Sequence, residues 1–370
     1  MIWLDRELQR TPALHDRADF RARLKLCASF WSAAVLCRFS FGLSLIVLLA
    51  VAPVALAQTN SSQESAPPRR RFERDEQRVH DPSTIIKCKD KYWVFVTGPG
   101  IPSKYSTNLI NWSSGPSIFT NPPSWTTNTI RENRGYFWAP DIVHLKSGYF
   151  VYYSVSSWGK RNSALGLVAN PTLDPADPAY HWTDRGLVVR TTETDDHNAI
   201  DPSVMLDKDG RLWLAFGSYW TGIKLLELDP ETGLRKGTNA PLYALAHNSS
   251  IEAACLTHHD DYYYLFVNWG TCCHGTNSTY EIRVGRSPVV IGPYLDRDGK
   301  NMLQGGGSLF LAGVGKRIGP GHAAILMDGD KPFISYHYYS AEEAGRPRLE
   351  IAPLKWTSDA WPDAGTPLRQ

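Results

Sequence analysis

The stretch HDPSTIIKCKDKYWVFV, residues 80–96, holds a polar tetrapeptide, a short apolar run, a polar turn and an aromatic run. Asp81, Pro82 and Ser83 are common turn residues, and proline restricts φ. The two runs carry the β-branched and aromatic residues that favour strands, and a tight polar turn separates them. The stretch therefore predicts a β-hairpin that begins at a polar key residue, Asp81.

The same arrangement returns four more times along the chain. A short motif with a key residue precedes an aromatic strand in each copy: Ala139-Pro140-Asp141 before KSGYFVYYSV, Ile200-Asp201-Pro202-Ser203 before DGRLWLAFGSYW, Ile251-Glu252-Ala253-Ala254 before HDDYYYLFVNW, and Gly321-His322-Ala323-Ala324 before DGDKPFISYHYY. The key residues at positions 81, 141, 201, 252 and 322 are 60, 60, 51 and 70 residues apart. Almost no segment between them has the period of an amphipathic helix.

This repeat predicts an all-β fold. A single hairpin cannot bury its apolar face, so repeated hairpins must pack on one another. Radial packing of five such units gives a five-bladed β-propeller with a central funnel, and a two-sheet sandwich with accidental spacing is the alternative. If each key residue opens the innermost strand of its blade, all five point into the funnel. Convergent titratable groups in such a concave place are the usual candidates for an active site.

The predicted propeller covers residues 79–370, and two segments of different character precede it. The uncharged residues 39–57 follow a basic region and end in Ala55-Leu56-Ala57, a small-x-small cleavage signal, so we interpret residues 1–57 as a signal peptide. An uncleaved membrane anchor is the alternative, because an apolar run of this length can just span a bilayer. Residues 58–78 are rich in Pro, Ser and Arg and are expected to form a flexible linker. We therefore expect a secreted protein.

The net charge argues against one class of partner, and the cysteines argue against one class of metal site. The formal net charge is +2, of which residues 1–57 contribute +3 and the remainder −1, which argues against a nucleic-acid partner. Four cysteines follow the signal segment without a pair of CxxC motifs, which argues against a zinc site: Cys88, Cys255, Cys272 and Cys273. For the adjacent pair Cys272-Cys273, we consider a vicinal disulfide in a rigid turn and two free thiols as alternatives.

The key carboxyl groups match the needs of glycosidic bond hydrolysis. That reaction requires a proton donor for the leaving oxygen and a carboxylate that acts on water or on the anomeric carbon. Glu252 lies between apolar residues, which raise the pKa of a carboxyl group, so Glu252 is the candidate acid. Asp81 and Asp201 lie in polar D-P-S turns that can keep a carboxylate ionised, so one can be the base and the other can tune Glu252. Asp141 shares the register but is expected to support a loop.

Seven motifs extend this pattern in order between Val79 and Trp356: HDPS, WAPDI, AIDPS, DGRLWLAFGSYWTGIKLLELDP, SIEAA, CCHGTNSTYEIRVGRS and IGPGHAA. The set resembles glycoside hydrolase family 43, and more narrowly the endo-1,5-α-L-arabinanases. The resemblance implies a five-bladed β-propeller that cleaves internal α-1,5-L-arabinofuranosidic bonds of arabinan with inversion. It makes Asp81 the general base, Glu252 the general acid, and Asp201 the residue that tunes the pKa of the acid and orients it.

The resemblance also implies binding residues around the catalytic three. Substrate contacts are expected at these positions: Asp81, Gly159, Asn198, Asp201, Ser218 and Trp220. His322 resembles a histidine that holds a cation, usually calcium, mainly through waters, and a core histidine is the alternative. The implied partner is plant cell-wall arabinan or the side chains of pectin. No protein partner is implied, so we expect a monomer.

Two other functions fit parts of the pattern. An exo-acting α-L-arabinofuranosidase or β-xylosidase can use the same fold, but such enzymes close one end of the groove with a loop or an added domain. The short stretch after the fifth repeat leaves no room for such a domain, which favours endo action. A non-catalytic sugar-binding propeller would tolerate the loss of Asp81 or Glu252, and both are present.

Overall fold

The computed structural model describes residues 77–237 and 239–368. The expected signal peptide and nearly all of the expected linker lie outside these residues. Arg78, the last residue of that linker, forms an antiparallel bridge with Arg348, and the Val79 N–H donates to the Pro347 carbonyl at 3.3 Å. The sheet structure thus already includes Arg78. No helix in the described part of the chain is long and apolar enough to cross a membrane.

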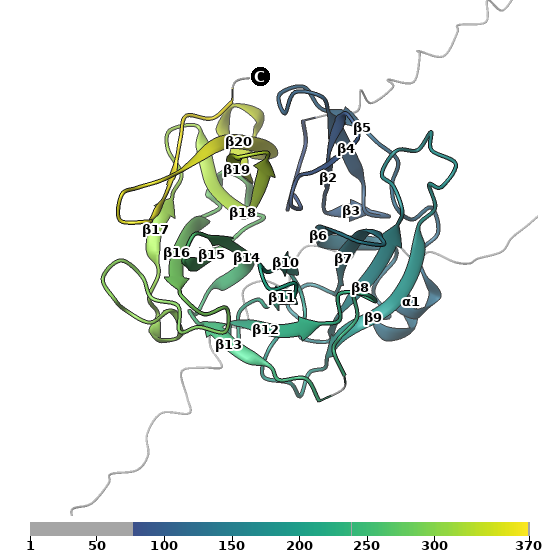
Figure 1. Cartoon of the computed structure of the whole chain (residues 1–370), viewed down its shortest axis with the longest axis horizontal. Helices are drawn as coiled ribbons and strands as arrows, with labels where there is room; N and C mark the ends of the chain where they lie inside the picture. The colour runs from purple at the N-terminus through teal and green to yellow at the C-terminus, as the bar shows by residue number, and fades with distance from the viewer. Residues whose placement is uncertain (1–76, 238, 369–370) are drawn as a thin grey trace, which may run out of the picture. The chain divides into compact units, whose positions relative to one another are not determined.

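The strands form five antiparallel sheets that follow one another around a common centre (Figure 1). The first two sheets contain these strands: β1 (Ile86–Cys88), β2 (Lys91–Phe95), β4 (Ser103–Ser106) and β5 (Ser113–Ser114), then β3 (Gly98–Pro99), β6 (Tyr136–Leu145), β7 (Gly148–Val155), β8 (Ser163–Asn170) and β9 (Thr183–Thr191). The third contains β10 (Ser203–Leu206), β11 (Leu212–Phe216), β12 (Ile223–Leu228) and β13 (Tyr243–Ala246). The last two contain β14 (Ile251–His259), β15 (Tyr262–Trp269), β16 (Glu281–Ser287) and β17 (Ser308–Leu311), then β18 (Arg317–Asp328), β19 (Lys331–Ser340), β20 (Arg346–Trp356) and β21 (Pro362–Ala364).

This arrangement confirms the predicted five-bladed β-propeller. The strands β1, β6, β10, β14 and β18 begin their sheets at the centre, apart from the short β3 beside β6. Among the described residues, helical structure is limited to short pieces: α1 (Ser124–Thr129), η1 (Gly275–Asn277), η2 (Met302–Gln304) and η3 (Ala341–Glu343). The helix α1 was not expected, because a single turn carries no detectable hydrophobic period.

The apolar core is divided among the contacts between blades. Five clusters of buried apolar side chains each join two neighbouring sheets, including one that joins the fifth sheet to the first. The middle strands β7 and β8 are buried along their whole length because a sheet covers each of their faces. The hydrophobic effect therefore favours a closed ring, in which no sheet has an uncovered face.

Candidate active site

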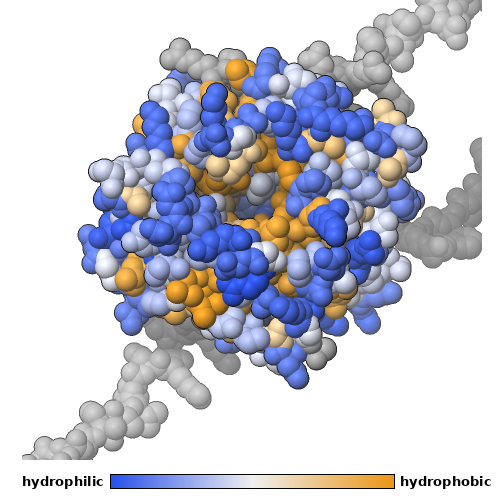
Figure 2. Space-filling view, in the orientation of Figure 1, coloured by the Kyte–Doolittle hydropathy of each residue, from blue (hydrophilic) through white to orange (hydrophobic). Residues whose placement is uncertain are grey.

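A cavity of about 870 Å³ lies at the centre of the propeller, and a hollow with apolar side chains around it marks this place in Figure 2. Every repeat contributes at least one lining residue: Asp81, Trp138, Asp201, Glu252 and His322. All eight residues expected from the sequence line this one cavity: Asp81, Gly159, Asn198, Asp201, Ser218, Trp220, Glu252 and His322. The fold therefore brings together groups that are up to 241 positions apart in the chain.

Each repeat has a non-glycine residue in the left-handed backbone region within or just before the innermost long strand of its sheet. These residues are Asp81 (φ 49°), Ala139 (φ 41°), Asp201 (φ 57°), Ala253 (φ 54°) and His322 (φ 58°). The conformation is costly for residues with a Cβ atom and persists where the surrounding structure enforces it. The common register of the repeats is therefore 81, 139, 201, 253 and 322. The key residues chosen from the sequence are offset from this backbone register by two residues at Asp141 and by one at Glu252, which nevertheless lines the cavity.

The correction explains where Asp141 lies. It stands two residues after Ala139, is buried, and does not line the funnel. Its Oδ1 accepts from the Thr84 N–H of the first repeat at 2.9 Å, and its Oδ2 accepts from the Val204 N–H of the third repeat at 2.8 Å. Two further bonds of this kind join later repeats: Leu256 N–H to Ser203 Oγ at 3.0 Å, and Ile325 N–H to Cys255 Sγ. Asp141 thus does not converge with the other key residues; it has a supporting role, but between blades rather than in a loop.

Asp81 is held as an ionised carboxylate. Its Oδ2 accepts from Thr97 Oγ1 at 2.6 Å and lies 2.8 Å from His80 Nδ1, while its Oδ1 lies 3.5 Å from His322 Nδ1. Burial alone raises the pKa of Asp81, but the hydrogen bond and charge of His80, with the charges of His322 and His337, lower the pKa well below its usual value. Oδ2 is thus bound by Thr97 and His80, whereas Oδ1 can accept a proton, as a general base must.

The surroundings of Glu252 and Asp201 raise the pKa values of these two carboxyl groups, in contrast to Asp81. Burial raises the pKa of Glu252, and the negative charge of Asp81 raises it further, against hydrogen bonds from Tyr280 and from Ser218 at 2.7 Å. Burial and the charges of Glu252 and Asp81 raise the pKa of Asp201 well above its usual value. This differs from the expectation that the D-P-S turn keeps Asp201 ionised. Asp201 accepts the Ala253 N–H at 3.2 Å, so it holds the backbone next to Glu252.

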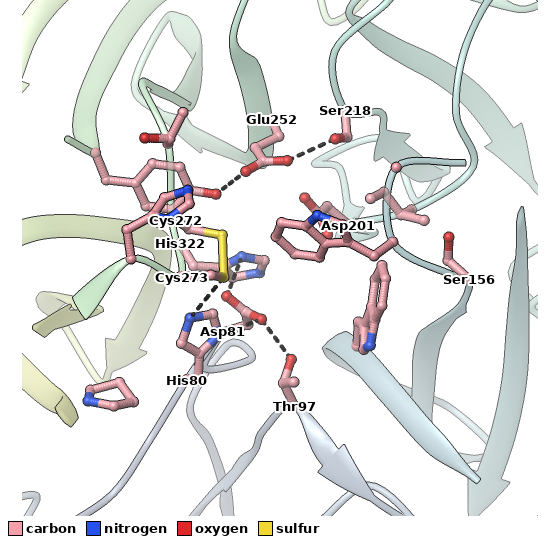
Figure 3. Close-up of a pocket in the computed structure, with 18 of the residues that line it drawn as sticks. His80, Asp81, Thr97, Ser156, Asp201, Ser218, Glu252, Cys272, Cys273 and His322 are labelled. Atoms are coloured by element: carbon pink, nitrogen blue, oxygen red, sulfur yellow. Dashed lines mark hydrogen bonds and ion pairs between the residues drawn. A yellow bond between two sulfur atoms is a disulfide. The ribbon is translucent and has the colours of Figure 1, made fainter. Parts of the chain in front are cut away.

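The other expected binding residues line the same cavity, where Figure 3 shows Ser218 beside Glu252. Ser218, expected to contact sugar, donates its hydroxyl to Glu252. Asn198 is buried with its Oδ1 unpartnered among the described residues, so it can accept a ligand hydroxyl. Trp220 is 37% exposed and lies under the Arg161 guanidinium, and Gly159 has open space where a Cβ would stand.

Several contacts of the catalytic groups escaped sequence reasoning. His80, Thr97, Tyr280 and Tyr339 line the cavity, and His337 lies buried behind it. His80 and Tyr280 lie inside motifs used for the resemblance, but nothing local distinguishes them from ordinary strand residues. Cys272 and Cys273 form a vicinal disulfide, which is the first of the two expected alternatives, and both line the cavity. Cys88 and Cys255 are buried and form no disulfide.

His322 offers only a limited fit to a cation. Its Nδ1 is the ring nitrogen near Asp81, which leaves Nε2 as the nitrogen that can face an ion. Metal-binding histidines commonly donate their second ring N–H to a carboxylate in this way. Within residues 77–237 and 239–368, however, the groups of three potential ligands do not include His322. Calcium prefers oxygen ligands, so waters would have to complete its coordination.

The arrangement supports acid–base hydrolysis in an aromatic cavity. An ionised Asp81 and a Glu252 with raised pKa converge with Asp201 from separate blades (Figure 3). Two carboxyl groups whose pKa values are pushed apart are the pattern of paired acid and base catalysts. Exposed rings at the rim, those of Tyr136, Trp158 and Trp220, provide flat apolar surfaces.

Known proteins are similar to this chain in both sequence and fold. The family model for glycosyl hydrolases family 43 matches residues 76–362. The extracellular endo-alpha-(1->5)-L-arabinanase 1 of Bacillus subtilis is 41% identical over 289 residues, which cover 77% of this chain and 87% of that protein. The extracellular exo-alpha-(1->5)-L-arabinofuranosidase ArbA of Cellvibrio japonicus is 39% identical over 298 residues, 77% of this chain and 85% of that protein. The structure of Cellvibrio cellulosa alpha-L-arabinanase complexed with arabinohexaose superposes with a TM-score of 0.75 at 36% identity, covering 78% of this chain and 96% of that one.

Proposed function

Because the chain belongs to glycosyl hydrolases family 43, we propose that it hydrolyses internal α-1,5-L-arabinofuranosidic bonds of arabinan. One observation carries this proposal: Asp81 with a lowered pKa and Glu252 with a raised pKa share one funnel. The similarity to the Bacillus subtilis endo-arabinanase supports the substrate and the endo mode. Plant cell-wall arabinan and pectin side chains are the natural sources of such a substrate.

In the proposed reaction each carboxyl group has its own step. Glu252 donates its proton to the leaving glycosidic oxygen as the bond from the anomeric carbon breaks. Asp81 removes a proton from the attacking water, whose oxygen forms the new bond to the anomeric carbon. Attack from the opposite face gives inversion. Asp201 orients the acid by accepting the Ala253 N–H next to Glu252, and a negative charge on Asp201 would favour the protonated form of Glu252.

Exo action is the second candidate, because the Cellvibrio japonicus relative of similar identity is named an exo-arabinofuranosidase. Endo and exo enzymes share the acid and base and differ in whether the cavity is open on both sides of the cleavage point. Linear arabinan separates the two modes. Rapid loss of viscosity before short products accumulate supports endo action, whereas short products of constant length from the first minute support exo action. No release of reducing ends would favour a sugar-binding propeller.

A calcium ion at His322 is a further part of the proposal. Nε2 of His322 would be the direct protein ligand, with waters completing the shell. When bound, the ion would supply positive charge that stabilises nearby carboxylates. The His322 ring itself keeps its Nδ1 3.5 Å from Asp81 Oδ1.

We also propose that the protein is exported. Two relatives are named extracellular, and the uncharged stretch 39–57 supports a cleaved signal. N-terminal sequencing of the protein recovered from culture medium tests this. A mature chain that begins at Gln58 is expected, and recovery only with membranes would favour an uncleaved anchor instead.

A further inference from the structure

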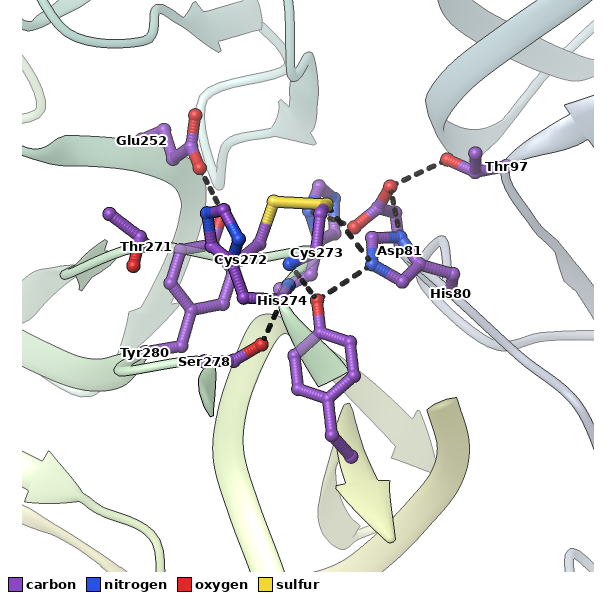
Figure 4. The surroundings of a disulfide bond; sticks show 12 residues. His80, Asp81, Thr97, Glu252, Thr271, Cys272, Cys273, His274, Ser278 and Tyr280 are labelled. Atoms are coloured by element: carbon purple, nitrogen blue, oxygen red, sulfur yellow. Dashed lines mark hydrogen bonds and ion pairs between the residues drawn. A yellow bond between two sulfur atoms is a disulfide. The ribbon is translucent and has the colours of Figure 1, made fainter. Parts of the chain in front are cut away.

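The Cys272–Cys273 turn forms part of the cavity wall beside Asp81 (Figure 4). The two cysteines follow β15 and are joined by a disulfide, with their Cα atoms 3.8 Å apart. The ends of the turn are tied together, since the Thr279 N–H donates to the Thr271 carbonyl at 2.9 Å and the Thr271 N–H donates to Thr279 Oγ1 at 3.0 Å. A disulfide between neighbours closes a small ring that restricts the backbone of both residues. The turn therefore presents its backbone groups in one arrangement.

A chain of hydrogen bonds leads from this turn to Asp81. The Cys273 N–H donates to the Tyr339 hydroxyl oxygen at 2.8 Å, and an amide N–H can only donate. The Tyr339 hydroxyl oxygen lies 2.9 Å from His80 Nε2, and the other ring nitrogen, Nδ1, lies 2.8 Å from Asp81 Oδ2. An ionised carboxylate can only accept, so His80 Nδ1 is the donor of the last bond whether or not Nε2 also carries a proton. The Cys273 amide thus holds the Tyr339 hydroxyl, and the Tyr339 hydroxyl holds the ring that binds Asp81.

The chain decides which oxygen of Asp81 is available for catalysis. His80 and Thr97 both bind Oδ2 at 2.8 and 2.6 Å, whereas Oδ1 has only the longer contact with His322 Nδ1 at 3.5 Å, so Oδ1 is the oxygen that can receive the proton of the attacking water. His337 Nδ1 lies 3.7 Å from Oδ1, but it accepts the Asp81 N–H at 3.1 Å and therefore cannot donate to Oδ1. Rotation of the carboxylate would break both bonds to Oδ2. A loss of the His80 contact would remove one of the two groups that hold this orientation.

We propose that the oxidised Cys272–Cys273 turn, acting through Tyr339 and His80, positions the Asp81 carboxylate for catalysis. This inference rests on the proposed function, in which Asp81 is the general base. A dithiol reagent would remove this constraint by reducing the disulfide. The reagent supplies two electrons and two protons, so the S–S bond breaks and two thiols form. The reagent itself is oxidised to a cyclic disulfide. The freed turn no longer holds the Cys273 N–H against Tyr339. Reduction should therefore lower kcat and leave KM for arabinan nearly unchanged.

The test compares oxidised and dithiothreitol-reduced protein on linear arabinan. Reduction of wild type should lower kcat by up to about 10²-fold, the scale expected for a catalytic group misplaced by about 1 Å. Tyr339→Phe cuts the chain, so its kcat should already be low and should not fall further on reduction. A Cys272→Ser/Cys273→Ser variant should have the kcat of reduced wild type, and dithiothreitol should not change it. Tyr264→Phe removes a hydroxyl that donates to the Ala360 carbonyl outside the cavity, so it should behave like wild type.

Melting curves show whether each variant is folded when it is assayed. An unchanged kcat of reduced wild type, or an equal loss on reduction in wild type and Tyr339→Phe, would overturn the relay. A reduction that raises KM at constant kcat would also overturn it, because the disulfide would then contact the sugar directly. Inactivity of oxidised wild type on arabinan would contradict the proposed function instead.

Discussion

Asp81 and Glu252 are both buried carboxyl groups, yet their surroundings shift them in opposite directions. Imidazole rings and a hydroxyl surround Asp81, so the charged form is favoured. Burial and the charge of Asp81 act on Glu252, so the protonated form is favoured, although Tyr280 and Ser218 oppose the shift. At the scale of single residues, the identity of the neighbours therefore separates the base from the acid.

Glu252→Ala and Asp81→Ala are each expected to lower kcat by about 10²–10⁴-fold, the usual contribution of a general acid or base. Glu252→Ala should recover on an aryl arabinoside, because its leaving group needs no proton, whereas Asp81→Ala should not. Steady-state kinetics on both substrates measures this. Asp207→Asn is a matched control, because Asp207 is a buried carboxyl that accepts from Trp213 outside the cavity. Activity within tenfold of wild type in either catalytic variant would refute the assignment.

Asp201→Asn should shift the alkaline limb of the pH–rate profile to lower pH. The charge of Glu252 raises the pKa of Asp201, so the two carboxyl groups titrate as an interacting pair. Removal of the Asp201 charge lowers the pKa of Glu252, and the general acid then loses its proton at a lower pH. The measurement is kcat/KM against pH for wild type and variant. A limb that stays in place would exclude a tuning role for Asp201.

At the scale of the strands, a sharp left-handed residue recurs where each repeat reaches the centre. The residue itself lines the funnel at Asp81, Asp201 and His322, whereas the residue two positions later accepts a backbone N–H from a neighbouring blade at Asp141, Ser203 and Cys255. Asp141 is the strongest case, because its two oxygens accept backbone donors from the blades on either side. In these repeats the same local geometry places one residue at the cavity and another at the contact between blades.

Asp141→Ala is expected to lower the free energy of unfolding by about 2–5 kcal/mol, since each buried N–H left without an acceptor costs roughly 1–3 kcal/mol. Asp141→Asn keeps one acceptor oxygen and should lose less. Urea denaturation of both variants gives the energies, and kcat of the folded protein should stay near that of wild type. A large loss of kcat with unchanged stability would place Asp141 in the reaction instead.

At the scale of the whole molecule, the central funnel forms because the fifth sheet packs against the first and closes the ring. The apolar cluster between the last and first sheets, with Val79 and Tyr92 packed near Leu349 and Ile351, completes the circle. His322 of the last sheet reaches Asp81 of the first across this closure. An ion at His322 would therefore act on the stability of the assembled ring as well as on the site.

A chelator should accordingly lower the melting temperature of wild type more than that of His322→Ala. The variant has lost the proposed ligand, so it has less bound cation to lose, and it should also be less active. Thermal unfolding with and without chelator, followed by addition of excess calcium, measures the effect. Equal shifts in the two proteins would mean that His322 holds no stabilising ion.

The sequence alone determined the propeller and which three carboxyl groups to look for at its centre, because these are signalled by local patterns: a hairpin repeated five times and short motifs around Asp81, Asp201 and Glu252. The tertiary structure decided the rest. His80 and Tyr339 are 259 positions apart, and Asp81 and His337 are 256 apart, so no spacing rule could pair them. The correct register was also hidden, because a left-handed Ala139 or Ala253 runs against the preference of alanine and is enforced only by packing at the centre of the ring.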